Sequence, residues 1–211
     1  MVDTYLHNTT TNKIIIPWSG GVDSTNILFK VLGYLENNEE IFNNIEGVYL
    51  LSAKSELDQG VIELKAKNKI IKFINKKHKK FKDKLFYEEF VHSFSGRDFR
   101  VGDLPQPYWW ITKVFSHYGS NFTLLLGYHR GDDFWMNFYK FSKLVDVSMD
   151  YFKNQNNRYI YYPLAYNYKD DIYNELPNKV KKMISFCELP IGNKPCKKCG
   201  SCKTHYKFIK E

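Results

Sequence analysis

A short run of small and acidic residues, SGGVDS at positions 19–24, separates an apolar segment from an amphipathic one. The preceding residues 13–17 (KIIIP) form a β-branched apolar run, which is typical of a buried strand in a parallel sheet. After Ser24, apolar residues recur at a spacing of three to four positions, which predicts a helix with one apolar side. SGGVDS is therefore expected to be a strand-to-helix turn.

A turn of this kind suits phosphate binding, because the unpaired N–H groups and the dipole at a helix N-terminus favour an anion. Glycines let a phosphate approach the backbone closely, serine hydroxyls donate hydrogen bonds, and an aspartate can hold Mg²⁺ between phosphates. The alternative is an ordinary glycine turn in which Asp23 or Ser24 caps the helix. A Walker A loop is excluded because no Gly-Lys-Ser/Thr follows at its spacing. The candidate phosphate ligands are Ser19, Gly20, Gly21, Asp23 and Ser24.

A second group of reactive residues lies near the end of the chain, where all four cysteines are spaced C-x8-C-x2-C-x2-C. No export signal is evident at the start of the sequence, so a cytoplasmic location is expected, and disulfides are rare there. Four thiolates suit tetrahedral Zn²⁺ with no ligand position left open, which predicts a structural site. A redox pair and an iron–sulfur cluster are the alternatives. The expected ligands are Cys187, Cys196, Cys199 and Cys202.

The composition describes a folded protein with one main core. The chain has 211 residues, of which 43% are hydrophobic and 17% aromatic, and this excludes a disordered chain. No apolar run approaches the length of a membrane span, so no membrane partner is expected.

The formal charge of +8 raises the question of a polyanionic partner. Much of the excess lies in residues 65–84, where isoleucines form an apolar side and lysines cover the rest. A solvated helix face is the favoured interpretation, and a nucleic-acid site is possible but not favoured, because few aromatic residues are interleaved with these lysines.

The other segments alternate between strand and helix patterns. Strands are expected at 45–53, 84–94 and 121–127, helices at 60–78, 108–119, near 132–146 and from Lys169 to Phe186, a turn-rich segment at 95–107 and a short apolar stretch at 159–165. This order predicts an α/β fold with a doubly wound, mainly parallel sheet of the Rossmann-like kind, with ligands at the carboxyl ends of the strands. Residues 1–165 are expected to form the α/β domain that carries the SGGVDS turn, and 166–211 a C-terminal helix with a small zinc-binding appendage.

The SGGVDS turn, after a strand and before a helix, resembles the pyrophosphate loop (PP-loop) of the N-type ATP pyrophosphatases. Together with the cysteine spacing, it is similar to the 7-cyano-7-deazaguanine synthases, the QueC family. Other stretches that resemble this family are ELKAKNKI (63–70), LLLGYHRGDD (124–133) and YPLAYNYKDDIYNEL (162–176). The resemblance implies a fold like that of the adenine nucleotide alpha hydrolases.

The resemblance also implies a reaction. Enzymes of this family adenylate the carboxylate of 7-carboxy-7-deazaguanine with ATP, releasing pyrophosphate, and ammonia then gives the amide and finally the nitrile. The implied cofactors are ATP, Mg²⁺ and Zn²⁺. Lys169 takes the position of the family's lysine and is expected to act with Asp23, the alternative being a surface lysine at a helix start. The expected substrate-pocket residues are Arg97, Arg100, Arg130, Asp132 and Asp133.

The sequence departs from the family where the substrate is bound. The family's Tyr-Gly-Gln, Gly-Arg-Asn and Tyr-Pro-Asp-Cys-Arg segments are replaced by YLLSAKSELDQG (49–60), SGRDFRVGDLPQPYWW (95–110) and DDFWMNFYKF (132–141). The substrate is therefore 7-carboxy-7-deazaguanine or a related acid. Two other functions stay open, a PP-loop enzyme that modifies tRNA and a non-catalytic nucleotide- or zinc-binding module. A homodimer is compatible with the sequence.

Overall fold

The computed structural model describes residues 2–7, 11–54, 58–91, 105–151, 158–187, 189–192 and 194–210. The strands are β1 (Lys13–Pro17), β2 (Gly47–Lys54), β3 (Leu85–Val91), β4 (Phe122–Leu125) and β5 (Arg158–Tyr161). The α-helices are α1 (Val2–His7), α2 (Val22–Asn37), α3 (Glu39–Asn44), α4 (Asp58–Lys77), α5 (Pro105–Tyr118), α6 (Phe138–Tyr151), α7 (Lys169–Glu175), α8 (Asn178–Lys181) and α9 (Gly200–Lys210). Two 3₁₀ helices are η1 (Lys79–Phe81) and η2 (Asp133–Asn137).

The strands form one five-stranded sheet in the order β3-β2-β1-β4-β5, and every neighbouring pair is parallel. Strand β1 is central, because Lys13 is paired with Gly47 of β2 on one side and with Phe122 of β4 on the other. The chain builds one half of the sheet outward from β1 and then returns to build the other half. The carboxyl ends of β1 and β4 thus flank the point where the strand order reverses, which is where such sheets bind ligands.

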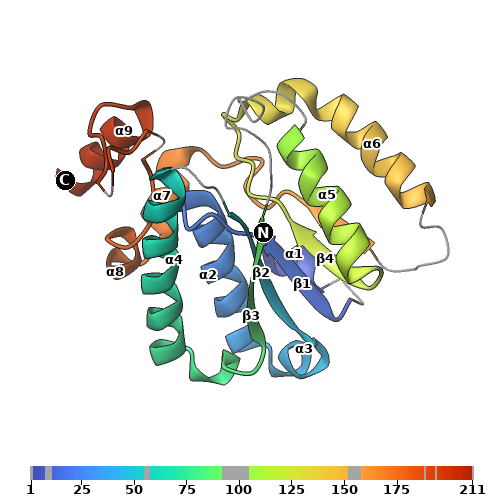
Figure 1. Ribbon diagram of the computed structural model, residues 1–211. Coiled ribbons are helices and arrows are strands. Elements are labelled where there is room, and N and C mark those ends of the chain that lie inside the picture. The colour runs from blue at the N-terminus through green and yellow to red at the C-terminus, as the bar shows by residue number, and fades with distance from the viewer. Residues whose placement is uncertain are drawn as a thin grey trace.

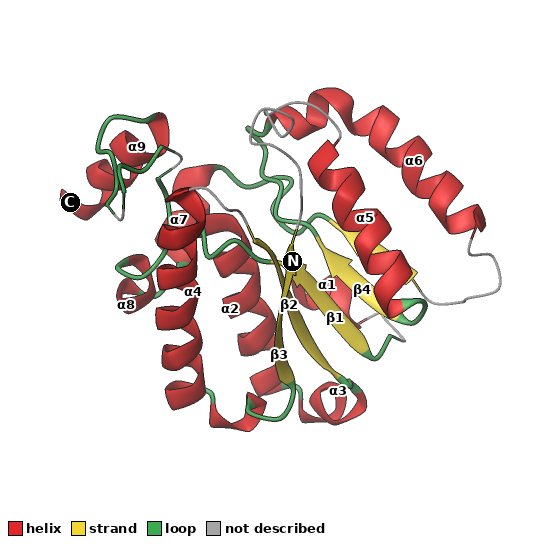
Figure 2. Cartoon of the chain, viewed as in Figure 1, coloured by secondary structure: helices red, strands yellow, loops and turns green. Residues whose placement is uncertain are grey.

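Helices cover both faces of the sheet, as Figure 1 shows. Successive strand residues point to opposite faces, so Ile14 and Ile16 join one hydrophobic core while Ile15 joins the other. The first core contains the buried sides of α2 and α4, and the second contains α5 and aromatic residues of η2 and α6. In Figure 2 the yellow strands form the middle layer between these two groups of helices. The predicted α/β fold with a parallel sheet is confirmed.

Three expected segments differ in the structure. The single helix expected from Lys169 to Phe186 is wrong, because α7 ends at Glu175 and α8 spans only Asn178–Lys181. Pro177 separates them, since proline has no N–H to donate and disfavours helical backbone in the residue before it. The apolar stretch at 159–165 contributes a strand, β5, which pairs with β4. The segment near 132–146 begins as the 3₁₀ helix η2 and continues as α6 to Tyr151.

The C-terminal part of the chain contributes to the main core through α7 and α8 and continues to α9. Ile172 of α7 and Val180 of α8 are fully buried in the same core as α2. Helix α9 carries the last cysteine and lies beyond α7 at the end of the molecule (Figure 1). Within the described residues, no helix has the length and apolar character needed to cross a membrane.

Candidate nucleotide-binding loop and metal centre

The SGGVDS turn is anchored at both ends. The backbone N–H of Trp18 donates to the Leu51 carbonyl at 2.6 Å, and the Trp18 indole N–H donates to the Thr25 hydroxyl at 3.1 Å. Gly20 has a φ of 78°, in the left-handed region, and Gly21 is the N-cap residue of α2. Helix α2 begins at Val22, so Asp23 lies in its first turn and is not the cap. The alternative of an Asp23 or Ser24 cap is therefore wrong.

The hydroxyl groups of the turn meet at this helix start. The Gly21 N–H donates to the Ser19 Oγ at 3.2 Å, and the Ser19 and Ser24 hydroxyls are 3.4 Å apart. Ser19 is exposed whereas Ser24 is buried. Helix α2 has 16 residues, and its first N–H groups are not capped by a side chain. Unpaired donors, a full helix dipole and hydroxyl groups together make this end of α2 suitable for an anion.

Gly20 is required for packing as well as for its backbone conformation. A Cβ added there would lie 3.0 Å from the Lys67 Cγ and 3.6 Å from the Ala66 Cβ, so α4 packs directly against the turn. Residues 66 and 67 belong to the ELKAKNKI segment. That segment therefore packs against the SGGVDS turn.

Replacing Gly20 by alanine is expected to destabilise the fold by about 1–2 kcal/mol, because the left-handed conformation alone costs a residue with a Cβ that much. Gly33→Ala is the matched control. Gly33 lies inside α2 and a Cβ there would meet nothing within 4 Å, so alanine should stabilise by about 0.5–1 kcal/mol. Urea unfolding of both variants measures the two free energies, and equal effects would contradict the role of Gly20.

The two residues expected to act together, Asp23 and Lys169, form an ion pair. They are 146 positions apart in the chain. Asn26 holds α7 in place, because its side-chain amide donates to the Ile172 carbonyl at 2.9 Å and to the Glu175 carboxylate at 3.0 Å. The second carboxylate oxygen of Asp23, Oδ1, is buried and has no hydrogen-bond partner among the described residues.

The loop after β4 completes the same edge of the sheet. A Cβ at Gly127 would lie 3.5 Å from the Ser24 N and 3.6 Å from the Asp23 Cβ, so the two loops are in contact. The Asp132 carboxylate accepts from the His129 backbone N–H at 2.7 Å and lies 3.3 Å from the His129 Nε2. Sequence reasoning missed His129, although it lies within the GYHRGDD stretch.

Charges from both loops act on Asp132. Burial raises the pKa of the Asp132 carboxyl, and the negative charge of Asp23 raises it further. The His129 backbone N–H, the His129 ring and the Lys169 ammonium oppose this rise. The Asp132 carboxyl is therefore within electrostatic range of both Asp23 and Lys169.

The other expected substrate residues have different surroundings. The Arg130 guanidinium is exposed and lies 4.8 Å from the centre of the Tyr168 ring, next to Lys169 in the chain. Asp133 is exposed at the start of η2. Arg97 and Arg100 lie outside the described residues. Arg130 and Asp132 thus lie at the edge of the sheet that carries the SGGVDS turn. Among the described residues, Asp133 has no contact with that turn.

The four cysteines come together as a compact cluster. Their sulfur atoms all lie within 4.8 Å of one another, and the Cys196 and Cys202 sulfurs are 3.8 Å apart. A tetrahedron with Zn–S bonds of about 2.3 Å requires sulfur separations of about 3.8 Å, so the cluster fits Zn²⁺. His205 is not part of this donor group.

Backbone N–H groups support the thiolate form. The Cys199 N–H donates to the Cys196 sulfur at 3.3 Å, and the Lys198 N–H does so at 3.4 Å. These two hydrogen bonds lower the pKa of Cys196 to about 6, so a metal ion would find a thiolate there near neutral pH. Lys197, which lies between Cys196 and Lys198, has a φ of 62°, in the left-handed region.

The four-cysteine cluster is connected to the SGGVDS turn. The Ser185 N–H donates to the Gly20 carbonyl at 2.8 Å, and Ser185 is two positions before Cys187. Phe186 stacks on the buried His205 ring of α9, with ring centroids 3.5 Å apart. The segment that carries the first cysteine therefore runs from the turn to α9.

Protein purified without chelators is expected to contain about one equivalent of zinc, because four sulfur donors with no water position form a closed site. Elemental analysis measures this directly. Iron in place of zinc would favour the iron–sulfur alternative, and a metal-free protein with a disulfide would favour the redox alternative.

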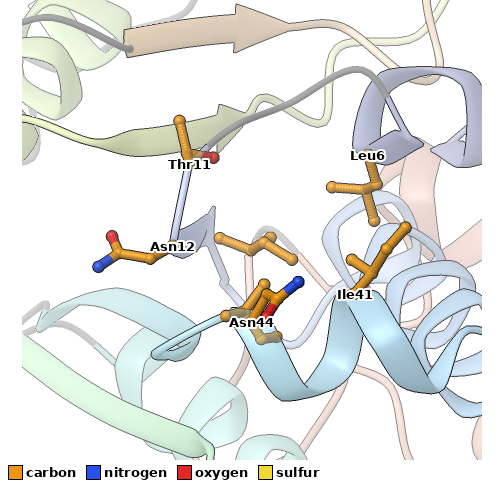
Figure 3. A pocket seen from close by; sticks show the side chains of 7 residues that line it. Leu6, Thr11, Asn12, Ile41 and Asn44 are labelled. Carbon is orange, nitrogen blue, oxygen red and sulfur yellow. The ribbon is translucent and has the colours of Figure 1, made fainter.

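A separate pocket of about 220 Å³ lies at the opposite edge of the sheet, where β1 begins (Figure 3). Its lining is apolar with two asparagines and one threonine: Leu6, Thr11, Asn12, Ile14, Ile41, Asn44 and Ile45. None of these lining side chains is charged or nucleophilic.

A comparison of the sequence with protein-family models found no match, and a comparison with curated proteins also found none.

Proposed function

We propose that this protein is an ATP-dependent carbon–nitrogen ligase that adenylates a carboxylate and transfers the acyl group to ammonia. The carboxylate is that of 7-carboxy-7-deazaguanine or a related acid, and the product is the amide or the nitrile. The observation that carries the proposal is the SGGVDS turn at the reversal point of the sheet, with Lys169 paired to Asp23 and with the loop of Gly127 packed against Asp23 and Ser24.

The chemistry requires activation, because a carboxylate has no good leaving group. Attack of a carboxylate oxygen on the α-phosphorus of ATP forms an acyl adenylate and releases pyrophosphate. Ammonia then attacks the acyl carbon, and AMP leaves with the original carboxylate oxygen. A second activation, of the amide oxygen, gives the nitrile with another AMP and pyrophosphate.

The residues have separate roles in this scheme. The N–H groups at the start of α2, with the Ser19 and Ser24 hydroxyls, bind the departing pyrophosphate. Lys169 stabilises the negative charge that develops on the phosphates. Mg²⁺, bound through Asp23, would neutralise part of the same charge. The Asp23–Lys169 ion pair keeps both groups at the turn before the nucleotide binds.

The four-cysteine centre has a structural role in this proposal. Zn²⁺ held by four thiolates has no free position for a substrate or water, so it would hold the chain together. The Ser185–Gly20 hydrogen bond connects the segment before Cys187 to the turn, so a metal ion at the cysteines would also help to fix the turn.

The test is an incubation with ATP, Mg²⁺, ammonium and 7-carboxy-7-deazaguanine, followed by mass spectrometry. The proposal predicts AMP and pyrophosphate together with the amide or nitrile of the acid. Formation of ADP and phosphate would contradict it. If the acid is unchanged while transfer RNA stimulates AMP release, the tRNA-modifying function, which the charge of +8 favours, replaces the proposal.

A further inference from the structure

Lys67 is a buried cation next to the nucleotide turn. It lies on α4, is 3% exposed, and its Cγ would be 3.0 Å from a Cβ at Gly20. Its ammonium donates to the Ser52 hydroxyl at the carboxyl end of β2. The other lysines near it on α4, Lys65 and Lys69, are exposed. Lysine is seldom fully buried unless it is paired with an anion.

The surroundings of Lys67 do not pair its charge. Within the described residues, no carboxylate lies within 4.0 Å of its ammonium, and the contact with Ser52 engages one of its three N–H donors. Glu63 of α4 and Glu89 of β3 favour the charged form from farther away. Burial outweighs both carboxylates and lowers the pKa of the lysine. The folded protein thus holds a poorly compensated cation under the turn.

We propose that Lys67 is part of the phosphate-binding site, where its ammonium binds the di- or triphosphate chain of the nucleotide from the β2 side of the turn. This inference rests on the proposed function, because it needs a nucleotide at SGGVDS. The site then has a lysine on each side, Lys169 next to Asp23 and Lys67 beneath Gly20. A bound phosphate supplies the anion that the buried ammonium lacks.

Packing alone does not explain why position 67 is a lysine. An apolar side chain of similar volume in place of a buried ion is often neutral or stabilising, so packing alone does not require a lysine there. The aliphatic part of the Lys67 side chain packs against Gly20, and methionine is a flexible apolar side chain that can replace that part. A bound anion would compensate the charge of the ammonium, which packing does not do.

The experiment measures the affinity for magnesium pyrophosphate and for ATP by titration calorimetry, with the metal-loaded chain of 211 residues. Lys67→Met is expected to keep or raise the melting temperature and to weaken pyrophosphate binding about 10-fold to 100-fold, as expected for a charge-assisted hydrogen bond. Lys67→Gln keeps a donor for Ser52 without the charge, and it should weaken binding to a similar extent. Lys69→Met, an exposed lysine on the same helix, is the matched control and should bind as the unaltered protein does.

Each outcome separates this inference from the proposed function. If Lys67→Met or Lys67→Gln folds and binds pyrophosphate as tightly as the unaltered protein, the inference is wrong while the ligase proposal stands. If the unaltered protein binds both ligands tightly, Lys67 variants lose them and no acid is activated, Lys67 is confirmed and the ligase proposal fails. If the unaltered protein binds neither ligand, both are wrong.

Discussion

Replacing Asp23 by alanine should lower ATP turnover by about 100-fold to 1,000-fold, which is the usual cost of removing one preorganised electrostatic group from an active site. The carboxylate is paired with Lys169, and its Oδ1 atom is buried without a partner among the described residues. Alanine removes the proposed Mg²⁺ ligand and also frees Lys169 from its position. Initial rates of AMP formation, at saturating ATP, measure the loss.

Stability should change little in the same variant. The pair is partly exposed, with 38% of the Lys169 side chain and 23% of the Asp23 side chain accessible, and such pairs contribute about 1 kcal/mol or less. Asp23 also raises the pKa of Asp132, so its removal relieves a repulsion. Asp170→Ala is the control, because Asp170 is an exposed carboxylate in the first turn of α7. A large fall in melting temperature for Asp23→Ala, with turnover per folded molecule retained, would make Asp23 structural.

Replacing Cys199 by alanine should release the metal and unfold the unit that contains α9. Binding energy at a structural zinc site is folding energy, of order 10 kcal/mol in small zinc peptides, and three remaining thiolates cannot close the tetrahedron. Elemental analysis should show loss of zinc, and hydrogen exchange should show loss of protection in α9. Lys203→Ala, an exposed position in the same helix, should retain both.

The main core should survive this change. The sheet and helices α2, α4, α7 and α8 are packed in cores that do not include the cysteines. Hydrogen exchange in β1 and β4 should therefore stay as it is in the unaltered protein. Retention of zinc in Cys199→Ala would show that this cysteine is not a ligand.

The elements that sequence predicts well are those with a strong local pattern. The apolar run KIIIP gives β1, and the spacing of apolar residues after Ser24 gives α2. Cysteines at C-x2-C spacing also come together for a local reason, because a short turn directs backbone N–H groups toward the Cys196 sulfur.

Other features depend on tertiary packing and were missed. Lys67 reads as one more surface lysine in a basic helix, yet its side chain is buried where α4 meets the turn. The tyrosines of β5 gave no clear strand pattern, because the strand lies at the edge of the sheet and is only partly buried.

The break between α7 and α8 at Pro177 could have been predicted from the sequence, since proline seldom continues a helix.

The Asp23–Lys169 ion pair was expected from the resemblance, but its formation depends on tertiary packing. The resemblance implies a role for both residues, but they are 146 positions apart and meet because α7 packs against α2. Asn26 adds hydrogen bonds to the Ile172 carbonyl and to Glu175. No local pattern near Lys169 indicates that contact.

The most direct test of the central claim follows the oxygen atoms of the acid. The substrate acid, labelled with ¹⁸O in its carboxylate, is incubated with ATP, Mg²⁺ and ammonium, and the nucleotide products are analysed by mass spectrometry. Adenylation predicts that AMP carries one ¹⁸O for each amide formed, because the acid oxygen leaves with the α-phosphate. Unlabelled AMP, or ADP as the nucleotide product, would contradict the account.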